Sequence, residues 1–119
     1  MVSGWKVRGR DDWTLLGKQN PQKPQMFNTI TGGDDEDMSV TKGDVIAARC
    51  TMVNHLDHSV QIGPTNNDEM CNFYLMYWIK GQKPMDMEHN NCFTAGPPVW
   101  SWYRNTLLTN IPDLEASTL

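Results

Sequence analysis

The residues whose types and spacing could do chemistry lie together in residues 67–77. Met70, Asn72 and Tyr74 are spaced two apart there, so an extended strand would place their side chains on one face. A thioether is a soft ligand that suits Cu(I), and Asn and Tyr side chains can hydrogen-bond a carboxylate. Because most methionines only fill gaps in a core, the pattern alone leaves a packing role for Met70 open.

The three cysteines, Cys50, Cys71 and Cys92, are the next candidates, and none belongs to a Cys-x-x-Cys pair. Cys50 and Cys71 fall on the inward faces of two predicted strands. A disulfide between them would close a loop of about 20 residues and stabilise the fold by about 3 kcal/mol. Two buried free thiols fit the same pattern, because a buried thiol behaves as a small hydrophobic group. An odd number of cysteines in a secreted domain suggests that one partner lies elsewhere.

The histidines give a weaker signal. His55 and His58 flank a predicted hairpin tip, and His89 is the third histidine of the sequence. A zinc site at the tip would need further ligands close by, which the sequence does not provide, so exposed loop histidines are the preferred interpretation. The sequence contains no nucleophile elbow, phosphate-binding loop or dinucleotide-binding fingerprint, so hydrolase, NTPase and Rossmann functions have no support.

The charge pattern argues against further classes of function. The formal net charge is -4 and the sequence has no basic run, so we expect no nucleic-acid partner. The acidic run at residues 34–37 lacks the ligand alternation of an EF-hand and is interpreted as a solvated loop. No stretch reaches the roughly 18 apolar residues of a membrane span, and no signal peptide is visible.

The elements that must position these side chains are predicted to be strands separated by turns that contain Gly and Pro. Residues 3–9 and 12–18 form a predicted hairpin, whereas residues 25–30 follow prolines and are expected at a sheet edge. The remaining candidate strands are residues 38–41, 45–53, 69–80 and 85–94. Many short strands in a single domain of 119 residues predict an all-β, antiparallel β-sandwich.

Alternation along two of these strands defines their faces. One face of residues 45–53 is predicted to point inward, and it carries Ile46, Ala48, Cys50 and Met52. Arg49 points the other way. The apolar face of residues 69–80 carries Cys71, Phe73, Leu75, Tyr77 and Ile79. The opposite face, with Met70 and Tyr74, is polar and aromatic, as expected of a sandwich wall beside a site.

The end of the chain follows a different pattern. Pro97 and Pro98 precede apolar residues at helical spacing, which predicts a short amphipathic helix. Its apolar face would carry Val99, Trp100, Tyr103 and Leu107. Residues 110–119 are expected to be frayed.

Four blocks of the sequence resemble the copper type II, ascorbate-dependent monooxygenases, and within them the peptidylglycine α-hydroxylating enzymes. The blocks follow the family's order and spacing and are VSGWKVR (2–8), WTLLGKQNPQKPQ (13–25), GDVIAARC (43–50) and NDEMCNFYLMY (67–77). The likeness fades after them, except near Cys92. The dopamine β-monooxygenases share the Glu-Met-Cys core, but Asn72, Tyr74 and the QNPQ block are more similar to the peptide enzymes.

The resemblance implies two jelly-roll-like β-sandwich domains, of which this chain is the C-terminal, catalytic one. It implies two copper ions, ascorbate as reductant, and hydroxylation of the α-carbon of a C-terminal glycine in a peptide. Met70 falls on the methionine ligand of the catalytic copper, whose other protein ligands in the family are two histidines. Asn72 and Tyr74 fall on residues that hold the carboxylate of the terminal glycine, and Cys50 and Cys71 fall on a disulfide pair.

The sequence also departs from the family. A His-x-His ligand pair, a substrate-binding arginine and the partner of Cys92 all precede, in the family, the block that begins here at Val2. The N-terminal copper domain precedes them in turn. We therefore expect residues 1–119 to be an N-terminally truncated catalytic domain, inactive alone, with Cys92 unpaired. The complete enzyme is expected to act on glycine-extended peptides in the secretory pathway lumen or outside the cell. The competing hypothesis is a non-catalytic or degenerate β-sandwich of the same family.

Overall fold

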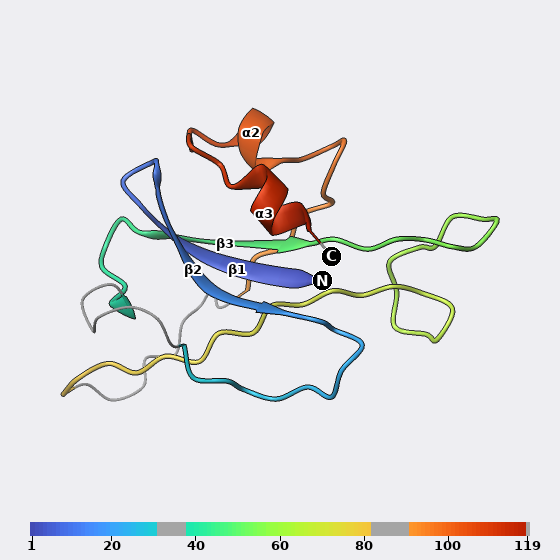
Figure 1. The fold of residues 1–119 in the computed structure, drawn as a ribbon, viewed down its shortest axis with the longest axis horizontal. Helices are drawn as coiled ribbons and strands as arrows, with labels where there is room; N and C mark the ends of the chain where they lie inside the picture. Colours follow the sequence, from blue (N-terminus) through green and yellow to red (C-terminus); the bar gives the residue numbers. More distant parts are fainter. Residues whose placement is uncertain (31–37, 82–90, 119) are drawn as a thin grey trace.

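The computed structural model describes residues 1–30, 38–81 and 91–118 of the chain (Figure 1). Its centre is a three-stranded antiparallel sheet, with two short helices above one face and extended chain along the other. The predicted all-β class is thereby confirmed. In these three ranges, no helix is long and apolar enough to cross a membrane.

The sheet has the strand order β2-β1-β3. β1 (Val2–Arg8) lies between β2 (Asp12–Gln19) and β3 (Val45–Cys50), and it is antiparallel to both. β1 is buried along almost its whole length, and a buried strand needs backbone partners on both edges. The predicted hairpin is confirmed, and Gly9 opens its loop with a φ of 65°, a left-handed conformation that glycine adopts readily.

A β-bulge interrupts the β1–β2 ladder next to Gly4. Gly4 pairs with Gly17, whereas Trp5 pairs with Leu15, so Leu16 is the extra residue of β2. Leu16 is buried, although its neighbour Leu15 is exposed. The bulge therefore turns an apolar side chain inward and leaves two glycines opposite each other in the ladder.

The face of the sheet under the helices holds the hydrophobic core. The helices are α2 (Trp102–Asn105) and α3 (Asp113–Ser117), and their buried side chains pack on Trp5 and Ala47. Trp13 lies with its ring centroid 5.1 Å from that of Trp102 and meets Trp5 edge to face. Aromatic pairs of this kind add about 0.5–1.5 kcal/mol to the free energy gained from buried area.

The other face of β1 is covered by chain without a strand ladder. The Phe73 ring packs on Gly4, where an added Cβ would lie 2.0 Å from the ring atom Cζ. Further along β1, Lys6 Nζ and Arg8 Nη2 both donate to the backbone carbonyl of Ser39, at 3.2 and 3.1 Å. The described residues form one sheet on this side and no second one, so the sandwich stays a prediction.

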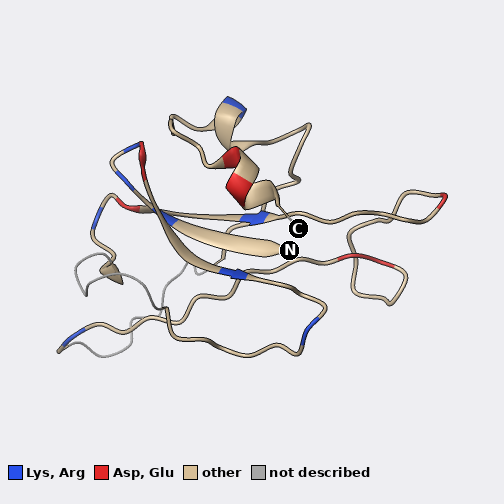
Figure 2. Cartoon of the chain, viewed as in Figure 1, with Lys and Arg blue, Asp and Glu red and all other residues tan. Residues whose placement is uncertain are grey.

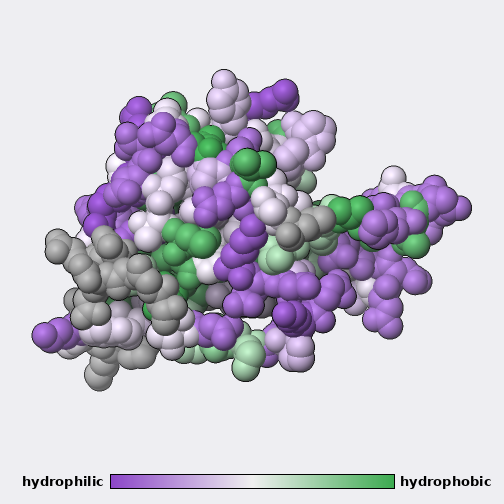
Figure 3. Space-filling view, viewed as in Figure 1, coloured by the Kyte–Doolittle hydropathy of each residue, from purple (hydrophilic) through white to green (hydrophobic). Residues whose placement is uncertain are grey.

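Many large apolar side chains lie outside the core. In Figure 3, patches of apolar colour interrupt the polar surface of the face in view. Trp78 is 82% exposed and Phe93 is 79% exposed. The hydrophobic core is therefore the cluster between the sheet and the helices, and apolar surface elsewhere in the described chain, including Tyr103 and Leu114 of the helices, is open to solvent.

Three predicted strands are wrong where the structure describes them. Residues 25–30, 38–41 and 91–94 form no ladder, and the rest of the predicted strand at 85–94 lies outside the described residues. Pro24 has no N–H to donate, which weakens the first of these segments as a strand. The chain around Ser39 accepts hydrogen bonds from side chains of β1 and so lies across the face of the sheet instead of extending it.

The longest predicted strand, residues 69–80, is also wrong as a paired strand. Within the described part of the chain, Glu69 alone forms a bridge, which is parallel and joins it to Ile62. The segment runs as extended chain along the side of the sheet away from the helices (Figure 1). Extended backbone becomes a strand only beside a partner edge, and this segment pairs with neither outer strand of the sheet.

The inward face predicted for residues 45–53 is wrong, and β3 ends at Cys50. Ala47 is buried, whereas Ile46 and Ala48 are exposed. The helices pack on the side that carries Ala47, which lies opposite Trp5 in the register. Alternation separated the two faces correctly, but it did not indicate which face the helices would cover.

The prediction for the end of the chain is wrong in both face and extent. The helix begins after Ser101, whose side chain accepts a hydrogen bond from the Arg104 backbone N–H. This start places Trp102 on the sheet at 4% exposure. Three residues of the predicted apolar face are exposed to solvent, namely Val99, Tyr103 and Leu107. Residues 110–119, expected to fray, contain α3, and its Ala116 is buried.

Candidate functional site

The predicted site residues, Met70, Asn72 and Tyr74, lie on the exposed side of the extended segment that follows residues 51–69. Met70 is 56% exposed and Tyr74 is 67% exposed, and Asn72 between them is exposed as well. Cys71 and Phe73 alternate with them and are half-buried. The predicted alternation of faces is therefore confirmed for this part of the segment.

Beyond Leu75 the alternation is lost. Tyr77 and Ile79 belong to the predicted apolar face, yet they are 53% and 42% exposed. No strand ladder fixes this stretch of the described chain, and no core lies under it. The attachment of the segment is therefore strongest at its beginning, where the predicted site residues lie.

Asn72 and Tyr74 meet each other. The Asn72 Nδ2 atom donates a hydrogen bond to Tyr74 Oη at 3.2 Å. This bond uses one amide hydrogen, so a second amide N–H and the phenol O–H remain available as donors. Two donors side by side on an exposed surface can bind a single carboxylate group.

A disulfide between Cys50 and Cys71 joins this segment to the end of β3. The two Cα atoms are 6.3 Å apart, and the bridge spans 21 residues of the chain. The pairing implied by the family resemblance is thereby confirmed. Cys92 is a free, exposed thiol in this structure.

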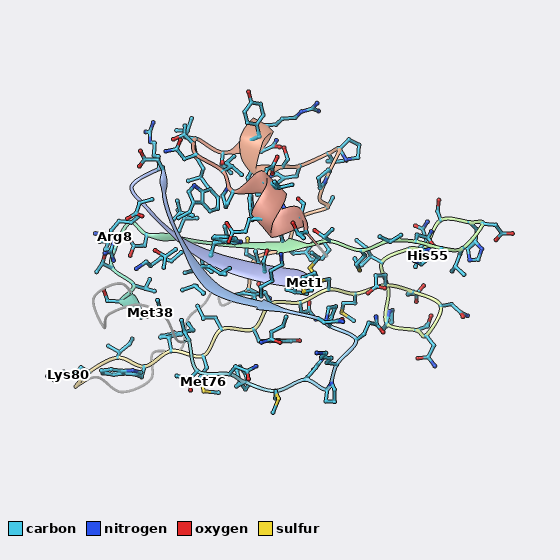
Figure 4. The ribbon with its side chains drawn as sticks, in the orientation of Figure 1. Met1, Arg8, Met38, His55, Met76 and Lys80 are labelled. Atoms are coloured by element: carbon cyan, nitrogen blue, oxygen red, sulfur yellow. A yellow bond between two sulfur atoms is a disulfide. The ribbon has the colours of Figure 1, made fainter. Side chains whose placement is uncertain are left out.

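The histidines do not join the predicted site. His55 lies on the long arm of residues 51–69 that projects to the right in Figure 4, whereas Met76 and Lys80 mark the opposite end of the molecule. His55 and His58 are exposed, and His58 Nδ1 lies 2.9 Å from Asp57 Oδ1. The interpretation as exposed loop histidines is confirmed for both. His89 lies outside the described residues.

The described residues do not by themselves fit a copper ion. Across residues 1–30, 38–81 and 91–118, no three His, Cys, Asp or Glu side chains are grouped so that they could hold a metal. Met70 offers one soft donor on an exposed surface, and a specific site needs a complete set of ligands in the right geometry. A catalytic copper would therefore need ligands beyond the described residues.

A charged cluster fixes the turn before β3. Arg8 donates from Nε and Nη2 to the two carboxylate oxygens of Asp44, at 3.2 and 3.0 Å. The backbone N–H of Thr41 donates to the same carboxylate. The hydrogen bond from Arg8, followed by that from Thr41, holds the pKa of Asp44 well below its ordinary value. The carboxylate therefore stays charged and links the turn to β1.

Arg49 forms a second cluster, which the sequence did not reveal. Its guanidinium lies 4.1 Å from the ring centroid of Trp102, and Nη1 donates to Asp113 Oδ1 and Ser117 Oγ. Figure 2 shows the acidic positions of α3 above a basic position on β3. An open cleft of about 430 Å³ lies beside these groups. From the sequence, alternation predicted only that Arg49 points away from Cys50, because its partners lie more than fifty residues further along the chain.

These features define a disulfide-linked all-β domain that presents a thioether and an Asn–Tyr pair on an exposed segment. Comparison with known proteins gives the family. Residues 1–105 match the family described as copper type II ascorbate-dependent monooxygenase, C-terminal domain. The chain belongs to this family, and the resemblance seen in the sequence is confirmed.

The relatives that the chain matches are much longer proteins. Over 83 residues it is 42% identical to the peptidylglycine alpha-amidating monooxygenase of Rattus norvegicus, and this alignment covers 69% of this chain and 8% of the rat protein. Over 115 residues it is 35% identical to the peptidyl-glycine alpha-amidating monooxygenase A of Xenopus laevis, and this alignment covers 96% of this chain and 11% of the frog protein. No solved structure gives a significant match.

Proposed function

We propose that this chain is part of the catalytic domain of a peptidylglycine monooxygenase, which hydroxylates the α-carbon of a C-terminal glycine. The observation that carries the proposal is the exposed row of Met70, Asn72 and Tyr74, joined to the sheet by a disulfide next to Met70. The relatives are peptidylglycine alpha-amidating monooxygenases, which supports glycine-extended peptides as the substrate class.

In this proposal, Asn72 and Tyr74 hold the carboxylate of the terminal glycine. Their mutual hydrogen bond brings an amide and a phenol within reach of one ligand group, and both side chains are exposed. Neutral donors orient a carboxylate but bind it less strongly than a charged, bidentate arginine does. The proposal therefore assigns the main positive charge to a residue outside this chain.

Met70 is proposed as one ligand of the catalytic copper, and histidines outside this chain are proposed as the others. Copper, when bound, would supply the dioxygen chemistry, and the proposal includes ascorbate as the reductant and a second copper on a separate N-terminal domain. The choice of Met70 among the methionines is supported by its position beside Asn72 on the exposed face. A thioether also favours the reduced state of copper.

The same proposal makes this chain inactive alone and places the complete protein in an oxidising compartment. Among the described residues, no three His, Cys, Asp or Glu side chains are grouped so that they could hold a metal with Met70, so we expect the purified chain to bind copper poorly. A disulfide such as Cys50–Cys71 persists in the secretory pathway or outside the cell, whereas cytosolic thiols are kept reduced.

The decisive experiment replaces Met70 with Ile in the full-length enzyme. This substitution keeps a similar volume, so it should cost less than about 1.5 kcal/mol of stability. We expect the variant to fold, to lose turnover, and to lose the Cu–S scattering in X-ray absorption of the reduced enzyme. Met76→Ile is the matched control, because Met76 is exposed on the same segment and should keep both signals. A folded and active Met70→Ile variant with unchanged copper spectra would exclude the ligand role.

A second candidate function is a non-catalytic β domain of the same family that only binds a partner. The observation in its favour is the lack of a group of metal ligands among the described residues. The two candidates differ in what accompanies the chain. A complete protein that carries no His-x-His pair and no second copper domain before Val2 would favour the non-catalytic domain.

A further inference from the structure

Two attachments on one side of residues 70–75 decide where the other side points. The first is the Cys50–Cys71 disulfide, and the second is the contact of the Phe73 ring with Gly4. Because side chains alternate along extended chain, fixing two residues that are two positions apart fixes the direction of the residues between and beside them.

Gly4 makes the second attachment possible because it has no side chain. A Cβ atom at this position would lie 2.0 Å from Phe73 Cζ and 2.3 and 2.5 Å from the two Cε atoms. These separations are well inside van der Waals contact, so any other residue would force either the ring or β1 to move. Gly4 pairs with Gly17 on one side and with Ala48 on the other. Because β1 is held on both edges, the ring is the part that would be displaced.

Backbone hydrogen bonds do not replace this contact. In the described chain, residues 71–79 form no strand ladder, and the bridge to Ile62 stops at Glu69. The Gly4–Phe73 contact is therefore an attachment of the segment to the sheet beyond the disulfide. Without it, no strand ladder in the described chain would hold residues 71–79 in their orientation.

We propose that Gly4 and Phe73 are positioning residues for the exposed face of Met70, Asn72 and Tyr74. The ring held against the glycine sets the orientation of that face relative to the sheet. The inference rests on the proposed function only for its consequence, which is that the oriented face receives the carboxylate of the substrate.

The test begins with the purified chain and two glycine variants. Gly4→Ala adds a methyl group that would overlap the Phe73 ring. Gly17→Ala is the control, because Gly17 is the residue of β2 paired with Gly4 and a Cβ added there would have no heavy atom within 4 Å. With the disulfide verified by mass spectrometry, we expect Gly4→Ala to shift the NMR amide resonances of residues 70–76. Gly17→Ala should leave them in place. Equal shifts from both variants would overturn the proposal.

Second-site rescue separates positioning from general destabilisation. Leucine lacks the Cζ and Cε atoms that the new methyl group would strike, so Gly4→Ala combined with Phe73→Leu should move the resonances of residues 70–76 back toward their original positions. A double variant shifted as far as Gly4→Ala alone would contradict the inference. Phe73→Leu alone leaves β1 unchanged and covers the case in which Gly4→Ala does not fold. It should shift the same resonances by less than Gly4→Ala does, because leucine can still pack on Gly4, and it should leave those of the Trp5 indole in place. Unchanged resonances at 70–76 would also overturn the proposal.

The consequence for function is measured in the full-length enzyme. Misplacing one or two hydrogen-bond donors costs about a tenfold increase in KM for glycine-terminated peptides. We expect Gly4→Ala to show this increase with a smaller change in kcat, and Phe73→Leu to reverse part of it. An unchanged KM in the Gly4→Ala variant would show that the Gly4–Phe73 contact does not help to position the substrate. A parent enzyme that does not hydroxylate peptides would refute the proposed function instead, and the NMR results would still decide whether Gly4 and Phe73 position the segment.

Discussion

The two faces of the central sheet are covered by different kinds of interaction. Above one face, α2 and α3 bury aromatic and aliphatic side chains against Trp5 and Ala47. Across the other, the chain is held at separate points: one disulfide, one ring on a glycine, and an arginine–carboxylate pair at the end of β1. The first face holds the hydrophobic core, and the second face attaches a segment whose site side chains stay exposed.

This difference explains how Met70 and Tyr74 can be exposed and yet be placed. A residue inside a core is oriented by its packing, but a ligand-binding residue must remain open to solvent. The disulfide of Cys71 and the contact of Phe73 with Gly4 orient the segment and leave the residues between and beside them exposed. If the two faces are independent, a change on one should leave the other in place.

The largest effect is expected on the helix-covered face. Trp102→Ala removes a buried indole that packs on Trp13 and lies under the Arg49 guanidinium. It should lower the free energy of unfolding in urea by about 3–5 kcal/mol, as for other buried aromatic residues. Tyr103→Ala, at the next and 83% exposed position of α2, should change it by less than about 0.5 kcal/mol. Similar losses from both would mean that the helices do not carry the core.

Removing the disulfide should act on the opposite face and mainly locally. Replacing Cys50 and Cys71 by Ala should cost about 3 kcal/mol, because the closed loop restricts the unfolded chain. Hydrogen exchange should accelerate in residues 69–80 before it accelerates in β1. Cys92→Ala, which alters a free and exposed thiol, is the matched control and should have little effect. Equal acceleration in β1 would show that the two faces are not independent.

A smaller effect, visible in acid, is expected at Asp44. Its pKa in the folded chain lies below the ordinary value of 3.8, so its contribution to stability is complete above that pH and is lost as the pH falls through the lower, folded pKa. The Tm of the unaltered chain should therefore fall steeply below about pH 4. Asp44→Asn should have a lower Tm near neutral pH and a shallower fall in acid. Parallel curves for the two proteins would show that Asp44 does not contribute in this way.

The smallest effect on stability is expected at Tyr74. Tyr74→Phe removes an exposed hydroxyl and should change the free energy of unfolding by less than about 0.5 kcal/mol. In the full-length enzyme, the proposed function predicts a higher KM, or a lower kcat/KM, for glycine-terminated peptides. Tyr77→Phe, half-exposed on the other row of the same segment, should leave the kinetics unchanged. Unchanged kinetics for Tyr74→Phe would remove this residue from the site.

The features that could be predicted from sequence alone depend on near neighbours in the chain. The hairpin follows from two β-favouring runs around a glycine that adopts positive φ, and the split between Met70 and Cys71 follows from the two-residue period of extended chain. The family blocks are likewise read along the sequence. The residue pattern left the Cys50–Cys71 bridge open, and the family resemblance supplied it.

Other features depended on partners far away in the chain, and tertiary structure alone decided them. The helices cover the Ala47 face of β3 because Trp102 and Ala116 pack there, and the local residue pattern of β3 does not indicate which face they cover. Residues 69–80 have the composition of a strand, but a ladder needs a neighbouring edge, which this segment does not find among the described residues. The role of Gly4 appears only when Phe73, 69 positions later, packs against it. A glycine in a strand is locally unfavourable, and the space that it leaves has value only once the fold places a ring there.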